Sequence, residues 1–248
     1  MKKREKLAII PQFYPGASTT IDSVNHLIDF IENELDLETN KVMMADSICS
    51  DDVNSIQYPS RALEFLGPFK MGGLDGFPFT GLTGMAAFAS HVPDDGAIFI
   101  YYGPHIGVSK AGKIGEITRK GQNHVSGCCG AAKAGLNKLI ADTIVEGNVT
   151  DMDYQMNSIE QILLKEKDRI LLSKEPLFEA TEVIYEAIDK RINDLVANTN
   201  FKCNWIVLVG AILINSDADM GSFTKTKRFD VIDLGAKTRK DYLKAYIL

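Results

Sequence analysis

Apolar residues along the chain follow two spacings, one typical of helices and one typical of buried strands. Helical spacing predicts a first helix over about 21–35, with Thr20 as its N-cap, and two long helices over 151–172 and 176–198. Shorter helices are predicted over 85–92, from about Cys129 onward and in the last residues of the chain.

Continuous apolar runs predict strands that are buried on both faces. These runs lie at 40–49, 97–102, 205–214 and 229–234, and a hairpin is predicted around Ala111 and Gly112. Because strands alternate with helices, the pattern favours an α/β fold with a partly parallel sheet flanked by helices. At 248 residues the chain suits one large domain or two small ones.

Composition narrows the classes of partner. A net charge of −6 argues against a general nucleic-acid binder, which would present a basic face. The longest apolar run, at 205–214, is too short to cross a membrane, and the run before Pro11 is too short for the core of a signal peptide. We therefore expect a soluble cytoplasmic protein with no membrane or nucleic-acid partner.

The rarer side chains suggest metal chemistry. Cys49 and His105 each follow a predicted strand, and Cys129 lies near the start of a predicted helix. Strand ends of an open α/β sheet share one crevice, and a helix N-terminus favours a thiolate. Two thiolates and one imidazole suit zinc, with a fourth position open to water.

A second interpretation of the same residues needs no metal. The chain has no CxxC and no HExxH motif, so Cys49, Cys128 and Cys129 also fit as small buried side chains, with His105 as a hydrogen-bonded turn residue. The glycine-rich middle of the chain matches neither GxxxxGK[ST] nor GxGxxG, which argues against nucleotide binding.

Four long segments resemble the limiting-carbon-dioxide-inducible B/C (LCIB/LCIC) family. They are "CSDDVN" at 49–54, "GGLDGFPFTGLTGMAAFASHVPDDG" at 72–96, "YYGPHIGVSKAGKIGEITRKG" at 101–121 and "CCGAA" at 128–132. The resemblance implies a single β-carbonic-anhydrase-like domain over 1–248, and a homodimer, because members of the family are usually dimeric.

The resemblance also implies a zinc (Zn2+) site. It puts the metal on Cys49, His105 and one cysteine of the Cys128–Cys129 pair, of which we choose Cys129. Asp51 matches the aspartate of the Cys-x-Asp motif of β-class enzymes, which ligates zinc in a closed state or pairs with an arginine in an open state.

The arginine of that pair is missing from its usual position, where this chain has Val53. Arg61 and Arg119 are the candidate partners of Asp51, and Arg61 ranks first because it is nearer in sequence. The chain also departs from the resemblance at Asp75, where relatives tend to have alanine, and an added carboxylate there would change the charge of the site.

The function implied is zinc-dependent, reversible hydration of carbon dioxide to bicarbonate, the reaction of a carbonic anhydrase, which is a lyase. His91 is a candidate proton shuttle, although a semi-buried structural role fits it equally, and Phe77, Phe79 and Leu82 are candidates for an apolar wall. The alternative is a non-catalytic zinc protein that binds carbon dioxide, bicarbonate or an assembly partner in carbon concentration. Thiol redox chemistry ranks last, because adjacent cysteines form a strained disulfide.

Overall fold

A computed structural model describes residues 9–54 and 58–246 of the chain. In this part of the chain, eight strands form one mixed sheet in the order β1-β9-β8-β4-β2-β3, with β10 pairing with β9 and β5 with β8. The strands are β1 (Ser18–Thr19), β2 (Val42–Ser47), β3 (Leu66–Lys70), β4 (Ala97–Tyr102), β5 (His105–Gly107), β8 (Trp205–Asn215), β9 (Ser222–Asp233) and β10 (Thr238–Asp241). A short antiparallel pair, β6 (Glu116–Ile117) and β7 (Ser126–Gly127), stands apart.

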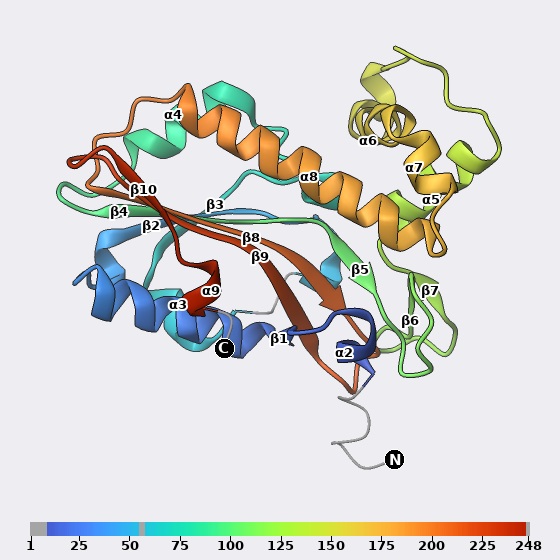
Figure 1. Cartoon of the computed structure of the whole chain (residues 1–248), viewed down its shortest axis with the longest axis horizontal. Coiled ribbons are helices and arrows are strands. Elements are labelled where there is room, and N and C mark those ends of the chain that lie inside the picture. The colour runs from blue at the N-terminus through green and yellow to red at the C-terminus, as the bar shows by residue number, and fades with distance from the viewer. Residues whose placement is uncertain (1–8, 55–57, 247–248) are drawn as a thin grey trace.

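Helices cover both faces of the sheet (Figure 1). They are α2 (Ile10–Phe13), α3 (Thr20–Glu34), α4 (Gly81–Ser90), α5 (Gly130–Ile140), α6 (Tyr154–Lys165), α7 (Lys167–Leu171), α8 (Pro176–Ala197) and α9 (Leu243–Tyr246). Short 3₁₀ turns are η1 (Thr39–Lys41), η2 (Asp52–Asn54), η3 (Ser60–Glu64), η4 (Leu74–Gly76) and η5 (Asp151–Asp153). Helices α3 and α9 lie on one side, α4 and α8 on the other, and α5 to α7 form a lobe beside α8.

The central strands alternate between two hydrophobic cores. In β4, Ile98 and Ile100 pack into the core under α4, α5, α6 and α8, whereas Phe99 and Tyr101 pack into the core under α3. This alternation explains why these strands read as continuous apolar runs, since neither face meets water. The prediction of an α/β fold with a partly parallel sheet is confirmed.

Local predictions hold best in this buried centre. The strand predicted at 97–102 is β4 (Ala97–Tyr102), and the strand at 205–214 is β8 with one more residue. The first helix begins one residue early, and its N-cap is Thr19, whose hydroxyl accepts from the backbone N–H of Asp22; the prediction of Thr20 as N-cap was wrong, because that side chain is buried.

One prediction near the surface was wrong. The helix predicted over 151–172 is divided into η5, α6 and α7, because Asp153 (φ −138°, ψ 38°) and Glu166 (φ −110°, ψ 22°) take non-helical backbone conformations. The helix predicted in the last residues agrees with α9, and 238–241 before it pairs antiparallel with the edge of β9. That edge supplies backbone partners that no local pattern reveals.

The turn between β4 and β5 fixes where the chain leaves the sheet. Gly103 has φ +151°, and a Cβ placed there would lie 1.6 Å from the carbonyl oxygen of Ala211. Only glycine allows β4 to pass this close to β8. The chain therefore re-enters the sheet at His105, opposite Leu213 of β8. In the described part of the chain, no helix is both long and apolar enough to cross a membrane.

Candidate metal centre

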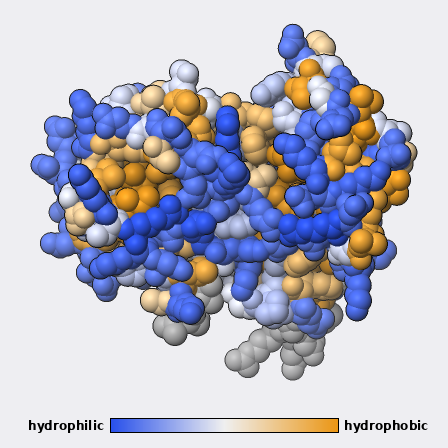
Figure 2. Space-filling view, turned by 45° about the horizontal axis from the view of Figure 1, so that its top comes forward, coloured by the Kyte–Doolittle hydropathy of each residue, from blue (hydrophilic) through white to orange (hydrophobic). Residues whose placement is uncertain are grey.

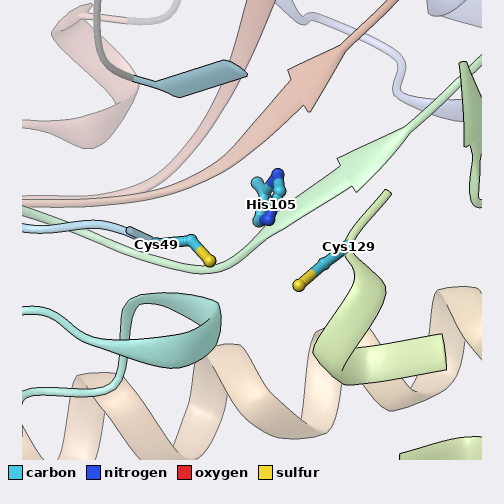
Figure 3. A group of neighbouring side chains, drawn as sticks. All are labelled: Cys49, His105 and Cys129. Carbon is cyan, nitrogen blue, oxygen red and sulfur yellow. The ribbon is translucent and has the colours of Figure 1, made fainter. Parts of the chain in front are cut away.

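Three separate elements bring Cys49, His105 and Cys129 together. Cys49 follows β2, His105 is the first residue of β5, and Cys129 is the N-cap of α5. Their ligand atoms all lie within 4.8 Å of one another, and each residue is almost fully buried. Figure 3 shows the three side chains converging on one space from the two strand ends and the helix start.

The orientation of the His105 ring is fixed by a hydrogen bond with Asn215. Its Nδ1 lies 2.7 Å from Oδ1 of Asn215, whose amide nitrogen donates to the carbonyl of Val53 and to Oδ1 of Asn54. This direction of the Asn215 amide places the proton on Nδ1, as in metal-binding histidines that donate to an outer carbonyl. The other ring nitrogen, Nε2, is buried with no hydrogen-bond partner among the described residues.

That orphaned nitrogen is the observation that favours a metal over the purely structural interpretation. A buried polar atom without a partner costs about 1–3 kcal/mol, and a cation at the two thiols would satisfy it. The donor set of two sulfurs and one imidazole nitrogen is one that zinc accepts. Cys49, His105 and Cys129 therefore fit zinc, and their role as ligands stays a prediction.

The neighbouring Cys128 lies on the other side of the imidazole. Its Sγ is 3.5 Å from Nδ1 of His105 and 3.6 Å from Oδ1 of Asn215. It belongs to a second possible group of ligand atoms, together with His105 and Asp51. The geometry therefore distinguishes the two adjacent cysteines, Cys129 facing Cys49 and Cys128 facing the Asn215 side.

Hydrogen bonding divides the charge unequally between the paired thiols. The hydrogen bond with Cys129 is the largest influence on the pKa of Cys49, which falls to about 4. The same bond, together with burial, raises the pKa of Cys129 well above its ordinary value. Burial acts to lower the pKa of His105, but contacts with Cys128 and Cys49 raise it well above the ordinary value in the metal-free protein.

The partner of Asp51 is Arg119, which reaches it from the loop after β6. The guanidinium donates to both carboxylate oxygens at 2.8 Å, and its Nε donates to Ser126 at 3.1 Å. Oδ2 of Asp51 lies 4.0 Å from Nε2 of His105. Burial acts most strongly and would raise the pKa of Asp51, but the hydrogen bonds from Arg119, together with those of Asp52 and the Val53 N–H and the charge of His105, hold that pKa well below its usual range.

Arg61 does not reach the centre, so its higher rank was wrong. Its guanidinium pairs with Asp29 at 2.7 Å and Glu32 at 2.8 Å, both on α3, and its side chain is partly exposed to solvent. The short 3₁₀ turn η3 lies against α3 and directs Arg61 there. Closeness in sequence to Asp51 was therefore a poor guide to closeness in space.

The remaining predicted residues lie in different places. His91 is the exposed C-cap of α4, with its ring 6.1 Å from that of Phe69, and within the described residues it makes no hydrogen bond or ion pair with the cysteines or Asp51. Leu82 is exposed beside a surface pocket between α4 and 198–202, so the structure does not place it in a wall at the centre. Phe77 packs against the core that contains Cys49 and Cys129, and the tilted ring of Phe79 lies beside it.

Two residues at the centre carry no recognisable motif. Asn215 ends β8 opposite Gly107 of β5, beyond the level at which β2 and β4 end, and its place at the end of a buried strand was the only available signal. Asp75 is completely buried in η4, its backbone N–H donates to Cys49 Sγ at 3.1 Å, and burial raises its pKa to about 7. The sequence indicated an added charge at Asp75 but not its contacts.

The comparisons with known proteins agree with this geometry. Residues 18–233 match the model of the limiting CO2-inducible proteins B/C, described as beta carbonic anhydrases. The match covers most of the chain, which therefore belongs to this family. No curated protein matches the chain.

Solved structures of the family share the fold. PtLCIB4, a homologue of the limiting CO2-inducible protein LCIB, has 26% sequence identity and a TM-score of 0.83, covering 95% of this chain and 98% of its own. A mutant of PtLCIB4 also has 26% identity, with a TM-score of 0.78 over 96% and 100% of the two chains. LCIB itself has 18% identity and a TM-score of 0.70, over 93% and 95%, which shows likeness of fold alone.

Replacement of single cysteines by serine tests the ligand set. We expect Cys49→Ser and Cys129→Ser to lower zinc affinity by more than the roughly 10–100-fold typical of outer residues, because a hydroxyl is a far poorer zinc ligand than a thiolate. Cys128→Ser is the matched control and should retain one zinc per chain in elemental analysis. Full zinc content in Cys49→Ser, or loss only in Cys128→Ser, would contradict the assignment.

Zinc binding should release about two protons at pH 7, because Cys129 and His105 must each lose one while Cys49 is already a thiolate. Both groups have pKa values above their ordinary ones, so protons compete with the metal and affinity should rise with pH between 6 and 8. Calorimetry in buffers of different ionisation enthalpy measures the released protons. A zinc affinity independent of pH would contradict this prediction, because it would show that zinc does not displace protons from the thiol and the imidazole.

Proposed function

We propose that this member of the family catalyses the reversible hydration of carbon dioxide to bicarbonate at a zinc ion held by Cys49, His105 and Cys129. The observation that carries the proposal is the pairing of Asp51 with Arg119. Two hydrogen bonds of 2.8 Å hold both oxygens of the carboxylate. Three protein ligands then leave a fourth position open, as in catalytic zinc sites.

When bound, zinc supplies a Lewis acid that makes water acidic near neutral pH. The chain's own residues do the remaining work. Asn215 holds the proton on Nδ1 of His105, which keeps Nε2 free for the metal. Asp51, ionised and held by Arg119, provides an acceptor 4.0 Å from Nε2 that would orient the reacting water.

Apolar side chains supply the environment that a neutral gas needs. Phe77 is half-buried against the core that includes Cys49 and Cys129, and its ring centroid lies 5.1 Å from that of Phe79. Such a surface favours carbon dioxide over water and strengthens the interactions of charged groups beside it. His91 is far less suited to a proton relay, since its ring contacts Phe69 at the end of α4.

One observation favours the non-catalytic alternative. Asp51, His105 and Cys128 also have ligand atoms within 4.8 Å of one another. If Asp51 left Arg119 and became the fourth ligand of the metal, water would be excluded from the metal and the site would be catalytically inactive. The chain would then bind carbon dioxide, bicarbonate or an assembly partner without turnover. The Asp51–Arg119 pair therefore decides between the two functions.

Stopped-flow hydration of carbon dioxide by zinc-loaded protein tests the catalytic proposal. We expect acceleration over the uncatalysed rate, and a loss of about tenfold or more in Asp51→Ala and Arg119→Ala. The reason is that a charge-assisted hydrogen bond contributes roughly 1.5–3 kcal/mol and 1.4 kcal/mol is one decade. Asp51 stays ionised across pH 7 to 8.5, so its titration should not shape the pH profile in that range.

Arg61→Ala is the matched control, because this arginine pairs with Asp29 and Glu32 on α3 and should leave the hydration rate unchanged. Zinc content measured on each variant separates loss of metal from loss of orientation. Wild-type protein with full zinc and no acceleration would overturn the catalytic proposal and leave the non-catalytic one.

We also propose that the chain forms a homodimer through its helical lobe. Among the described residues, seven large apolar side chains are exposed between 140 and 172: Ile140, Val145, Val149, Met152, Tyr154, Leu171 and Leu172. Figure 2 shows apolar side chains on this lobe, at the right of the view. A concentration of exposed apolar surface of this kind is typical of interfaces.

Light scattering should give twice the mass of one chain for the wild-type protein at micromolar concentration. The double variant Met152→Glu, Leu172→Glu should be monomeric, because it places charges on the two most exposed apolar side chains of the lobe, which are 96% and 85% accessible. Leu63→Glu, a change at an equally exposed leucine outside the lobe, is the control and should stay dimeric. A monomeric wild-type protein would rule the dimer out.

A further inference from the structure

Asp75 occupies an unusual backbone position inside the protein. It is completely buried in η4 and adopts a left-handed conformation with φ 52° and ψ 19°. A residue with a side chain is uncommon in this region, although aspartate tolerates it better than most. A buried carboxylate at a strained position indicates a role that the surrounding structure sustains.

The turn that carries Asp75 is held from several sides. The N–H of Leu74 donates to Oε1 of Gln155 on α6 at 2.8 Å, and the hydroxyl of Ser47 donates to the carbonyl of Gly76 at 2.8 Å. A Cβ on Gly76 would lie 2.3 Å from the carbonyl oxygen of Gly103. The turn is therefore held between the ends of β2 and β4 by contacts with the protein itself.

From this turn Asp75 contacts all three predicted ligands. Its N–H donates to Sγ of Cys49 at 3.1 Å, and its Oδ1 accepts from the N–H of His105 at 3.4 Å. Burial raises the pKa of the carboxyl group, and the nearby side chain of Cys129 acts to lower it. The predicted ligands lie after β2, in β5 and at the start of α5. Asp75 belongs to a fourth element, η4, and lies next to all three ligands.

One carboxylate oxygen of Asp75 has no hydrogen-bond partner. Oδ2 of Asp75 and Nε2 of His105 are both buried without a hydrogen bond among the described residues. Two buried polar atoms without partners beside a pair of thiols form an environment that a bound cation would satisfy. Arg119 does not fill it, because its guanidinium is bound to Asp51, Asp52 and Ser126.

We propose that Asp75 is a positioning residue of the metal centre, which sets the relative places of Cys49, His105 and Cys129 and directs its free carboxylate oxygen toward the bound cation. The inference rests on metal binding at these three residues and is independent of whether the centre hydrates carbon dioxide. Asp75 is an outer residue: it acts on the metal through its ligands and through its charge. Residues of this kind orient the ligands, and their replacement typically lowers metal affinity by roughly 10–100-fold.

Two substitutions separate the contributions of Asp75. Asp75→Asn keeps the shape, the backbone N–H and one acceptor oxygen, and removes only the carboxylate, whereas Asp75→Ala removes the whole group. The matched control is Asp46→Asn on β2. Asp46 is also a buried carboxylate, 2% exposed, but it pairs with Lys70 and Tyr58 and not with the ligands.

Zinc affinity is measured by competition with a chelator, and geometry by the absorption spectrum of the Co2+-loaded protein. We expect Asp75→Asn to weaken zinc binding by roughly 10–100-fold, with a shifted Co2+ spectrum, and Asp75→Ala to weaken it at least as much. Asp46→Asn should bind zinc within about twofold of the wild type, because residues without shared partners act independently.

Asp75→Asn with wild-type zinc affinity and an unchanged Co2+ spectrum would overturn the inference. If Asp75→Ala does not fold, Asp75→Asn alone decides, because it preserves volume. Wild-type protein that binds no zinc would overturn both this inference and the catalytic proposal. Wild-type protein that binds zinc without hydrating carbon dioxide, with affinity lost in Asp75→Asn, would overturn only the catalytic proposal.

Discussion

The parallel pairing of β2, β4 and β8 is the constraint on which the centre depends. Ser47 lies opposite Tyr102, and Tyr102 lies opposite Gly210, so β2 and β4 end at the same level of the sheet, whereas β8 continues to Asn215 and pairs there with β5. Cys49 and His105 come just beyond the ends of β2 and β4, and Asn215 is the last residue of β8. A slip of one residue in the register would turn each strand's side chains to the other face and separate the imidazole from both its sulfur and its amide neighbours. The two hydrophobic cores that fix this register therefore also fix the donor set.

Charge is the second constraint, because acidic groups outnumber basic ones at the centre. Cys49, Asp51 and Asp75 can each carry a negative charge, and Cys129 adds another when it is deprotonated. Arg119 neutralises Asp51 through two short hydrogen bonds, which leaves the sulfurs and Asp75 without a fixed cation. The metal-free protein compensates by keeping protons on Cys129 and His105, whose pKa values are raised. A divalent cation replaces those protons with a partner that also satisfies the orphaned Nε2 of the imidazole.

Sequence alone predicted those parts of the centre that depend on local pattern. The strand at 97–102 and the positions of Cys49 and Cys129 followed from apolar runs and from the start of a helix, and the family resemblance added the role of Asp51. The arginine partner could not be chosen, because Arg61 and Arg119 are both loop-borne and only the packing of η3 on α3 takes Arg61 away. Asn215 and the contacts of Asp75 were missed because each depends on which segments meet across the sheet edge, and no short motif encodes such a meeting.

Asp51 is held by Arg119 and not by an arginine at position 53, where this chain has Val53. This difference determines which segment of the chain restrains the carboxylate. Arg119 lies between β6 and β7, the antiparallel pair whose second strand leads directly into Cys128 and Cys129. Its Nε donates to Ser126 of β7, so one segment carries both the clamp on Asp51 and one predicted ligand. An arginine two residues after Asp51 would instead restrain the carboxylate from its own loop. Here a displacement of β6 and β7 would loosen Asp51 and move Cys129 together. In the proposed mechanism, release of Asp51 from Arg119 is thus linked to the position of Cys129 through one short segment of backbone.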